Sequence, residues 1–433
     1  MPIKIIIMGA AGRDFHNFNV LYRNNPKYKV AAFTAAQIPG IAGRRYPAKL
    51  AGRLYKKGIP IYDEKKLVSL IKKHKVNGVV FSYSDVSYRE LKQKEKLVKK
   101  AGADFVLVPP KKTMLKSRKK VISVCATRTG AGKSQTTRYV CDILKSLKKK
   151  FVVIRHPMPY GDLIKQEVMR FAKFTDMKDC TIEECEEFEP HLKQGNIVYC
   201  GVDYEKILKK AEKEASVIVW DGGNNDTPFY SPDLHIVVAD PLRAGDEIKY
   251  YPSDANVALA DVVVINKENS STKRNISIVE KNVLGLNSKV KIVHANSPIE
   301  VDEPAVIAGK KVIVVEDGPT LTHGGMKYGA GYVAAKKYKC KIVPAFRYAV
   351  GSIKDTYKKY KQIRKMLPAM GYGKKQIMEL QRIINNANAD AVIVATPVDI
   401  TRFMKLNKPT VKVSYSLEEK GNRLEKIIRK KFK

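Results

Sequence analysis

A short glycine-rich segment carries the clearest chemistry of the chain. Residues 127–134 read Thr-Arg-Thr-Gly-Ala-Gly-Lys-Ser, after an apolar run at 121–125 and before a stretch at 135–144 that is predicted to be a helix. A strand, a glycine-rich turn, Gly-Lys-Ser and a helix follow one another in this order in P-loops, where backbone N–H groups and a helix N-terminus bind phosphate. Threonine replaces the first glycine of that motif at position 127. The segment predicts a nucleoside triphosphate site formed by Thr129, Gly130, Ala131, Gly132, Lys133, Ser134 and Gln135.

Catalytic and metal-binding roles follow from the residue types. We expect the Lys133 ammonium to contact the β- and γ-phosphates and the Ser134 hydroxyl to bind Mg²⁺. Asp221 ends the apolar run 217–220, and a carboxylate at the carboxyl end of a parallel strand is well placed to assist Mg²⁺. The alternative is that Asp-Gly-Gly-Asn forms a plain turn, because these residues accommodate positive φ. We predict Ser134 and Asp221 as the metal residues, and Lys133 and Asp221 as catalytic.

Two later strand ends add residues to the predicted nucleotide site. One strand leads into Asn266 and Lys267, an Asn-Lys pair that frames the base in many P-loop proteins. A guanine-selective version would carry Asp at position 269, where this chain has Asn, whose amide both donates and accepts. The expected nucleotide is therefore ATP or GTP, with Mg²⁺. Arg243 follows another strand and is expected to act catalytically, by stabilising charge as the γ-phosphoryl group leaves.

Loops outside the P-loop offer cations and hydroxyls to a second anion. Arg155 and His156 open a loop at the carboxyl edge of the predicted sheet, where α/β proteins form binding sites; a plain turn is the alternative. A glycine-rich loop at 317–331 is suited to hold an anion on its N–H groups, and a flexible surface loop is the alternative. Its side chains for this role are Thr320, Thr322, His323 and Lys327. These two loops predict a small anionic substrate.

The chain opens on a third candidate anion site. Gly9 and Gly12 begin a turn after an apolar strand, but Phe15 stands at the third glycine position of a dinucleotide fingerprint, and no acid ends the second strand. We therefore expect no nicotinamide there. Arg13 and His16 lie beside the start of a helix, which favours a phosphate or a carboxylate. We expect this turn to face the P-loop across a domain junction.

Alternating strands and helices predict an α/β fold with parallel sheets. Residues 1–118 are expected to form a Rossmann-like domain, followed by a P-loop NTPase core at 119–300. Residues 301–433 are expected to be a C-terminal α/β extension of that core, or a subdomain. The expected strands are 3–8, 30–34, 78–81, 105–108, 121–125, 151–154, 217–220, 235–239, 262–265, 290–293, 311–315, 340–344 and 391–395.

The composition is strongly basic, with 81 Lys and Arg against 43 Asp and Glu and a net charge of +38. A surface adapted to a salt-rich or anion-rich cytoplasm, an anionic substrate and nucleic acid each explain such a charge. We rank nucleic acid last, because the basic stretches lack interleaved aromatic residues. An exception to the basic bias is the run of glutamates at 183–189, which could hold a metal or pair with lysines of the same chain. We expect it on a solvated helix, and a switch-like role is the alternative.

Location and partners follow from what the sequence contains. No apolar run has membrane-spanning length and no apolar leader opens the chain, so we expect a cytoplasmic protein without a membrane partner. The six cysteines form no Cys-x-x-Cys pair and are expected to be free thiols. Whether the chain forms a homo-oligomer stays open.

Several segments together resemble a known family. Residues 9–19, 34–41, 155–162 and 316–326 are similar to an archaeal and bacterial family described as predicted P-loop GTPases or as cyclic 2,3-diphosphoglycerate synthetase-like proteins. The P-loop also resembles those of dethiobiotin synthetase and cobyrinate amidase relatives, which use ATP to phosphorylate a carboxylate. The synthetase label implies γ-phosphoryl transfer from ATP to 2,3-diphosphoglycerate, followed by closure to a cyclic phosphoanhydride. The GTPase label implies hydrolysis of GTP.

The predicted function is that of an NTP-dependent enzyme, which transfers the γ-phosphate of ATP to a small anionic substrate. A regulatory GTPase is one alternative, and preference for guanine would favour it. A nucleic-acid-associated ATPase is the other, and binding that weakens steeply with salt would favour that reading.

Overall fold

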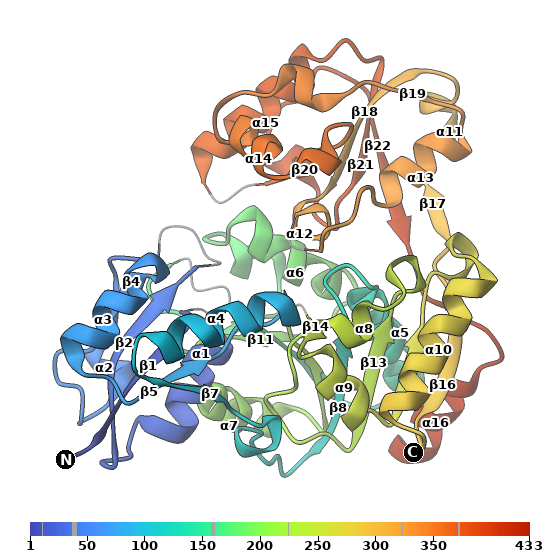
Figure 1. Ribbon diagram of the computed structural model, residues 1–433. Coiled ribbons are helices and arrows are strands. Elements are labelled where there is room, and N and C mark those ends of the chain that lie inside the picture. Colours follow the sequence, from blue (N-terminus) through green and yellow to red (C-terminus); the bar gives the residue numbers. More distant parts are fainter. Residues whose placement is uncertain (11, 37–40, 157–160, 224, 323, 371–372) are drawn as a thin grey trace.

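Three α/β bodies make up the molecule in the computed structural model, which describes residues 1–433 except 11, 37–40, 157–160, 224, 323 and 371–372. Figure 1 shows the first body in blue, the second from teal to yellow, and the third in orange and red above the other two. Each body is built on one sheet in which most neighbouring strands are parallel. The predicted α/β class with parallel sheets is confirmed.

The N-terminal body has a six-stranded sheet in the order β3-β4-β2-β1-β5-β7. Its strands are β1 (Ile3–Met8), β2 (Tyr28–Ala35), β3 (Arg45–Tyr46), β4 (Ile59–Asp63), β5 (Gly78–Phe81) and β7 (Asp104–Leu107). Apolar side chains of α1 (Arg13–Asn17), the π-helical turn Phe18–Tyr22 and α2 (Ala48–Ala51) cover one face. Those of α3 (Leu67–His74) and α4 (Tyr88–Lys100) cover the other face. The four strands predicted for this region are all present.

The second body contains the P-loop, and its sheet has the order β10-β11-β9-β12-β8-β13-β15-β16-β23. The strands are β8 (Lys120–Ala126), β9 (Phe151–Arg155), β10 (Met169–Phe171), β11 (Val198–Cys200), β12 (Val217–Asp221), β13 (Leu234–Ala239), β15 (Val262–Ile265), β16 (Lys291–Asn296) and β23 (Glu418–Glu419). The helices are α5 (Lys133–Ser146), α6 (Ile182–Lys193), α7 (Tyr204–Glu214), α8 (Asp246–Lys249), α9 (Ser253–Leu259), α10 (Lys273–Leu286) and α16 (Arg423–Phe432). Apolar residues of α7, α9 and α10 pack on one face of the sheet, and those of α5 and α16 on the other.

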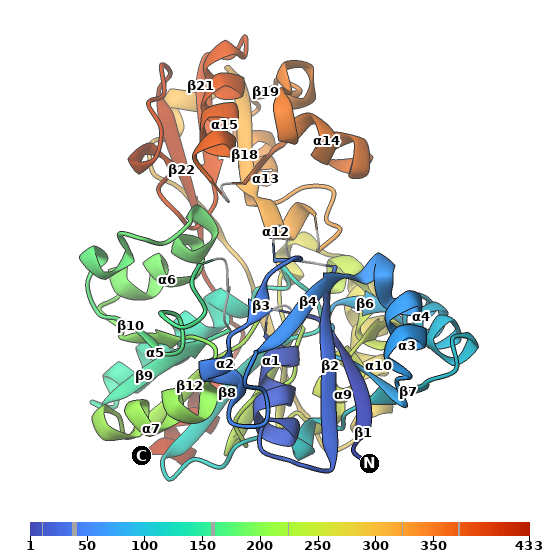
Figure 2. The same ribbon diagram turned by 90° about the vertical axis from the view of Figure 1, so that its left-hand side faces the viewer.

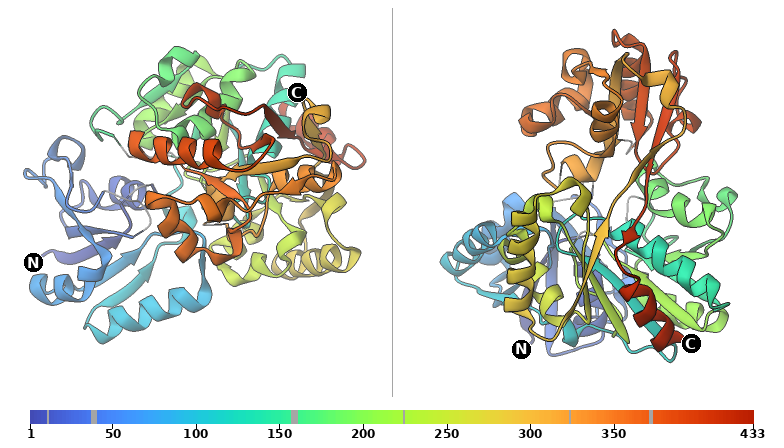
Figure 3. Two further views of the ribbon diagram at one scale, coloured as in Figure 1. Left: turned by 90° about the horizontal axis from the view of Figure 1, so that it is seen from above. Right: turned by 90° about the vertical axis from the view of Figure 1, so that its right-hand side faces the viewer.

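The third body is inserted between β16 and β23. β17 (Ile299–Val301) leads into it and pairs with the returning antiparallel strand β22 (Thr410–Tyr415), and Figure 3 shows both strands running between the two bodies. Its other strands are β18 (Lys311–Asp317), β19 (Lys341–Ile342), β20 (Leu367–Ala369) and β21 (Ala391–Ala395). Its helices are α11 (Pro304–Ile307), α12 (Gly318–Leu321), α13 (Ala330–Lys337), α14 (Gly351–Lys359) and α15 (Lys374–Asn386).

The last residues of the chain return to the P-loop body. β23 pairs with β16, and Leu424, Ile428 and Phe432 of α16 are buried in the same core as α5. Residues 301–433, expected as one continuous part, are therefore divided between the inserted body and the P-loop body. The P-loop body is closed by a segment that lies more than a hundred residues after β16 in the chain.

A small two-stranded sheet joins the first two bodies. β6 (Val86–Ser87) of the N-terminal body pairs with β14 (Tyr250–Tyr251) of the P-loop body. Figure 2 shows the N-terminal body beside the P-loop body, below the inserted one. All six cysteines are free. In the part of the chain that the structure describes, no helix combines the length and apolar composition needed to cross a membrane.

Candidate active site

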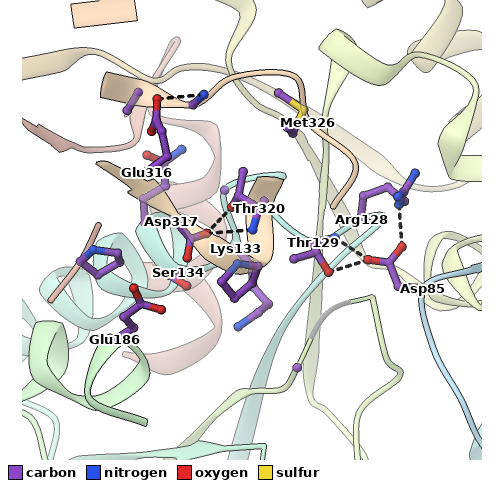
Figure 4. A pocket seen from close by; sticks show the side chains of 18 of the residues that line it. Asp85, Arg128, Thr129, Lys133, Ser134, Glu186, Glu316, Asp317, Thr320 and Met326 are labelled. Atoms are coloured by element: carbon purple, nitrogen blue, oxygen red, sulfur yellow. Dashed lines mark hydrogen bonds and ion pairs between the residues drawn. The ribbon is translucent and has the colours of Figure 1, made fainter. Parts of the chain in front are cut away.

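All three bodies line one cavity of about 690 Å³. The P-loop forms one wall, the ends of β1 and β5 form a second, and the end of β18 with α12 and α13 forms a third (Figure 4). Parallel strands meet their ligands at their carboxyl ends, and here the carboxyl ends of strands from three separate sheets converge. The predicted site residues on this cavity are Arg13, Thr129, Gly130, Gly132, Lys133, Ser134, Gln135, Arg155, His156, Lys267 and Thr320.

The P-loop has the backbone that phosphate binding requires. Gly132 precedes α5 with φ +111°, and a Cβ there would lie 2.0 Å from the Asn266 Nδ2 atom, so only glycine fits this position. No side chain caps the N-terminus of α5. The first N–H groups of that helix are therefore available to an anion, and the helix dipole favours negative charge there.

Asn266 and Lys267, which we expected to frame the nucleotide base, donate hydrogen bonds to the backbone of the P-loop instead. The Asn266 amide donates to the Ala131 carbonyl oxygen at 3.1 Å. Lys267 donates to the Gly130 carbonyl oxygen at 2.5 Å and to Asp240 at 3.1 Å. Lys267 lines the cavity, whereas Asn266 and Ala131 lie behind the wall. In this structure the Asn-Lys pair thus fixes the shape of the P-loop.

Lys133 belongs to a buried charge network centred on Asp221. The Asp221 carboxylate accepts hydrogen bonds from Lys133 at 2.5 Å and from Thr137 at 2.9 Å, pairs with Arg155, and lies 3.0 Å from the His191 Nε2 atom. Burial alone would raise the pKa of the Asp221 carboxyl, but Arg155 and Lys133 hold it well below its usual range. Burial, with Arg155 nearby, lowers the pKa of Lys133 to about 8. Asp221 is fully buried and does not line the cavity, so it acts on Lys133 from behind.

The site fits the triphosphate and the Mg²⁺ that the sequence predicts. The Ser134 hydroxyl lines the cavity and makes no hydrogen bond to another described residue. The buried Gln135 Nε2 donor beside it also has no partner among the described residues. The described residues contain no group of three His, Cys, Asp or Glu that could hold a metal ion alone. Mg²⁺ keeps water and substrate phosphates among its ligands, so a hydroxyl beside bound phosphates is a sufficient protein contribution.

Arg243 supports the P-loop from outside the cavity wall. It pairs with Asp240 at 2.8 Å and donates to the carbonyl oxygens of Thr129, at 2.9 Å, and Gly324, at 2.6 Å. These bonds tie the P-loop to the turn that follows α12. Arg243 is absent from the cavity lining, and its catalytic role stays a prediction.

An acid that the sequence reasoning missed contacts the P-loop from the N-terminal body. Asp85 accepts hydrogen bonds from the Thr129 backbone N–H at 3.1 Å and from the Arg128 Nε atom at 2.6 Å. It lines the cavity just after β5. The signal that could have found it is its position in Ser-Tyr-Ser-Asp after a predicted parallel strand, the same rule that singled out Asp221.

The N-terminal glycine turn does face the P-loop, but its cations are already paired. Arg13 bonds to Asp226 at 3.0 Å and to the Thr227 hydroxyl at 2.8 Å, and it lies over the Phe229 ring. His16 does not line the cavity, because its ring stacks on Phe229 at 4.0 Å and contacts the Thr113 carbonyl oxygen at 2.7 Å. Burial and nearby Arg13 hold the pKa of His16 well below its usual value. These contacts dock the N-terminal body on the P-loop body.

The glycine-rich loop after β18 holds an internal carboxylate. Glu316 accepts hydrogen bonds from the backbone N–H groups of Gly329 at 3.1 Å, Gly331 at 3.2 Å and Tyr332 at 2.8 Å. Two of the loop N–H groups that we expected to bind a substrate anion, those of Gly329 and Gly331, are therefore engaged by Glu316. Thr320 lines the cavity and its hydroxyl donates to Asp317.

The remaining predicted residues of that loop do not reach the cavity. Thr322 is buried and donates to the Gly318 carbonyl oxygen at 2.8 Å, while Lys327 is exposed and absent from the cavity lining. His323 lies outside the described residues. The Arg155 loop is described at Arg155 and His156 and from Gly161 on; Arg155 is buried in ion pairs with Asp221 and Glu187.

The expectation of a solvated acidic helix is wrong for α6. Glu186 and Glu189 are buried, because α6 lies between the P-loop body and the inserted body. The Thr396 hydroxyl of the inserted body donates to Glu186, and Arg402 pairs with Glu189 at 3.0 Å. In Figure 4 the side chains of Glu186, Asp317 and Ser134 point into the same part of the cavity.

Among the described residues that line the cavity, the proportion of acidic side chains is higher than in the chain as a whole. Seven carboxylates and six Lys or Arg side chains line the cavity, whereas the whole chain has 43 acids against 81 Lys and Arg. Four of these cations, Arg128, Lys133, Arg155 and Lys267, belong to the P-loop body. Glu316 and Asp317 lie at the end of β18, and Glu186 of α6 lies near Asp317 and Ser134 (Figure 4). The part of the cavity lined by these carboxylates is thus suited to a neutral or cationic ligand.

Comparison with known proteins gives two curated relatives. No protein-family model matches the chain. The sequence is 57% identical over 429 residues to the arginine synthetase ArcE of Thermococcus kodakarensis, covering 98% of this chain and 96% of that protein. It is 25% identical over 297 residues to the cyclic 2,3-diphosphoglycerate synthetase of Thermococcus sibiricus, covering 60% of this chain and 66% of that protein. A solved structure, LpxK from Aquifex aeolicus in complex with ATP, matches 85% of this chain and all of that chain at a TM-score of 0.45 and 13% identity.

Proposed function

The chain belongs to the arginine synthetase family and is therefore an enzyme of the ATP-dependent synthetase class, and we propose that its product is arginine. One structural observation carries this proposal: a P-loop faces, across one cavity, a wall of carboxylates whose Glu316 and Asp317 have no cationic partner among the described residues. Such a wall suits a guanidinium, which carboxylates bind through paired hydrogen bonds.

The chemistry of the product defines the acceptor. Arginine differs from its ureido counterpart by a nitrogen in place of the ureido oxygen. ATP supplies the γ-phosphoryl group, which bonds to that oxygen as the bond to ADP breaks. An ammonia nitrogen then bonds to the carbon, and the oxygen leaves with the phosphate. The reaction consumes ATP, the ureido amino acid and ammonia, and releases ADP, phosphate and arginine.

The P-loop residues and their partners would have defined roles in this scheme. Lys133 and the N-terminus of α5 would bind the β- and γ-phosphates and stabilise charge during transfer. Ser134 would contribute its hydroxyl to Mg²⁺, which neutralises phosphate charge when bound. Asp221 would orient Lys133, and Arg243 would hold the Thr129 carbonyl in place. Closure of three bodies around the cavity would keep water from the phosphorylated intermediate.

The second candidate is phosphoryl transfer to a small anionic substrate, as in the cyclic 2,3-diphosphoglycerate synthetase relative. The similarity to that protein and the basic composition support it. The positions of the acids oppose it, because a polyanion opposite the P-loop would lie against Glu186, Glu316 and Asp317. Nothing in the comparisons supports a GTPase. The nucleic-acid-associated ATPase stays a prediction, tested by the salt dependence of RNA or DNA binding.

An assay of product formation tests the proposal. The chain is incubated with ATP, Mg²⁺, the ureido counterpart of arginine and an ammonium salt, and arginine and ADP are quantified. We expect equal amounts of arginine and ADP, and no arginine when any substrate is omitted. ADP release that requires 2,3-diphosphoglycerate, without arginine formation, would overturn the proposal in favour of the second candidate. Replacing ATP by GTP in the same assay shows whether the enzyme prefers adenine or guanine nucleotides.

A further inference from the structure

Glu316 is a buried carboxylate at the surface of the cavity. It lies near the end of β18, which pairs with β21 on one side and with β19 and β20 on the other. Only 2% of the residue is exposed, yet it lines the cavity. The three N–H groups of Gly329, Gly331 and Tyr332 fix both carboxylate oxygens. A charged side chain is thus held rigidly at a ligand-facing wall.

The surrounding backbone is shaped around this carboxylate. A Cβ at Gly329 would lie 2.3 Å from one Glu316 oxygen. A Cβ at Gly331 would lie 2.7 Å from Val314 and 3.3 Å from the other Glu316 oxygen. The two glycines therefore allow the loop to approach closely enough to donate its N–H groups. A side chain at Gly329 would collide with the carboxylate, and one at Gly331 would collide with Val314.

No cation neutralises Glu316 within the described part of the chain. Its charged and titratable neighbours are Asp317 on the same strand, Glu186 on α6, Tyr415 on β22 and the exposed Lys336 on α13, and none of them forms an ion pair with it. Burial raises the pKa of Glu316 to about 7, although the backbone N–H groups oppose the shift. Such a carboxylate exchanges protons near neutral pH, as a general base must.

The helix α12 and the turn after it, which follow β18 in the chain, lie directly against the P-loop. A Cβ at Gly130 would lie 2.9 Å from the Thr320 hydroxyl, and a Cβ at Gly324 would lie 2.9 Å from the Thr129 carbonyl oxygen. Thr320 in turn donates to Asp317, the neighbour of Glu316. A group phosphorylated at the P-loop would therefore lie near the β18 carboxylates, and Asp317 lies close to Ser134 in Figure 4.

We propose that Glu316 is the general base that deprotonates the attacking amine in the synthetase reaction. This inference rests on the proposed function. An ammonium ion binds at the carboxylates, one N–H bond breaks and its proton passes to Glu316. The freed electron pair forms the bond to the activated carbon, and the C–O bond breaks with release of phosphate. Asp317, one residue on, keeps the positive charge attracted to this wall until the proton is transferred.

A purely structural role for Glu316 is the rival explanation, since the carboxylate also anchors residues 329–332. The two roles differ in their dependence on the nucleophile. A base is needed for ammonium but not for hydroxylamine, which is neutral near pH 7 and attacks the same carbon. A loop anchor would be needed for both nucleophiles equally.

The experiment compares the wild type, Glu316→Gln and Glu379→Gln with each nucleophile. Glu379 is a matched control, because it is a buried carboxylate of the same body that accepts from the Ser352 backbone N–H at 2.9 Å, away from the cavity. We expect E316Q to lose about 10²-fold or more of kcat with ammonium and to remain within about tenfold of the wild type with hydroxylamine. E379Q should keep the wild-type ratio of the two rates. An equal loss with both nucleophiles, or no loss with ammonium, would overturn the proposal.

A second measurement uses the wild-type protein alone. With Glu316 as base, wild-type kcat/KM for total ammonium rises with pH up to about 7 and then reaches a plateau. Without a base, only free ammonia reacts, and kcat/KM keeps rising about tenfold per pH unit until ammonium itself is deprotonated. A continuing rise would contradict the proposal. Failure of the proposed function is a separate result, because the wild type would then form no arginine at any pH.

Discussion

The two walls that face each other across the cavity balance their charges in opposite ways. On the P-loop wall each of these cations forms an ion pair with a nearby acid. Lys133 and Arg155 pair with Asp221, Arg128 with Asp85, and Lys267 with Asp240. On the wall formed by β18, Glu316 and Asp317 have only backbone N–H groups and the Thr320 hydroxyl among the described residues. The first wall is electrostatically complete before the nucleotide binds. The second leaves its negative charge for a ligand.

Removing the cation at the centre of the P-loop wall should have the largest effect on activity. We expect Lys133→Ala to lower kcat by about 10²–10³-fold, because the ammonium stabilises charge that develops during phosphoryl transfer. Lys145→Ala, on the exposed side of the same helix α5, is the control and should keep wild-type turnover. Steady-state ADP release measures both. Wild-type turnover in Lys133→Ala would show that the P-loop is not the site of transfer.

Removing the acid behind that wall should act on stability. Asp221→Asn would leave two buried cations without their counter-ion, and we expect a loss of about 3–5 kcal/mol in the free energy of unfolding, measured by denaturant titration. The wild-type pKa of Asp221 is held well below its unfolded value, so its contribution is present above that value and lost as the pH falls through the folded pKa. The variant should therefore lose less stability on acidification. An unchanged unfolding curve would show that the network is not coupled to folding.

The lowered pKa of Lys133 gives the P-loop wall a specific pH dependence. Free Lys133 titrates at about 8, and bound phosphates favour its charged form. ATP affinity should be highest and constant below that pH, and it should fall by up to about tenfold per pH unit above it. Isothermal titration calorimetry across this range measures the slope. A flat affinity profile would mean that Lys133 does not titrate with the nucleotide.

The opposite wall should respond to the ligand's positive charge. We expect Asp317→Asn to weaken arginine as a product inhibitor by about tenfold or less, because one charge-assisted contact is lost. Asp355→Asn, exposed on α14 of the same body, should leave inhibition unchanged. Inhibition constants for arginine against ATP turnover provide the comparison. A stronger effect on ATP affinity than on arginine would place Asp317 at the phosphates or Mg²⁺.

The sequence predicts the parts of this molecule that depend on local pattern. The P-loop and the strands are recognisable because apolar runs, glycines and Gly-Lys-Ser lie next to each other in the chain. The insertion of a whole body between β16 and β23 cannot be recognised in this way, because it depends on β17 pairing with a strand that is more than a hundred residues distant in the chain. The apolar pattern of α16 does not show which sheet it covers.

The site shows the same division between local and distant contacts. Lys133 and Ser134 follow from the motif, whereas the contact of Asp85 with Thr129 joins residues of different bodies. The sequence predicts that the glycine-rich loop offers its N–H groups to a substrate anion, whereas in the structure the N–H groups of Gly329 and Gly331 donate to Glu316 of the same chain. The sequence pattern of such a loop is the same whether it binds the carboxylate of a substrate or a carboxylate of the protein itself. The burial of Glu186 likewise depends on Thr396 of the inserted body.

A crystal structure with a non-hydrolysable ATP analogue, Mg²⁺ and arginine tests the opposition of the two walls most directly. We expect the triphosphate along the P-loop, with Lys133 and Ser134 at its β- and γ-phosphates, and the guanidinium at Glu316 and Asp317. A guanidinium bound elsewhere, or a phosphorylated ligand seated on the β18 wall in place of arginine, would contradict the account.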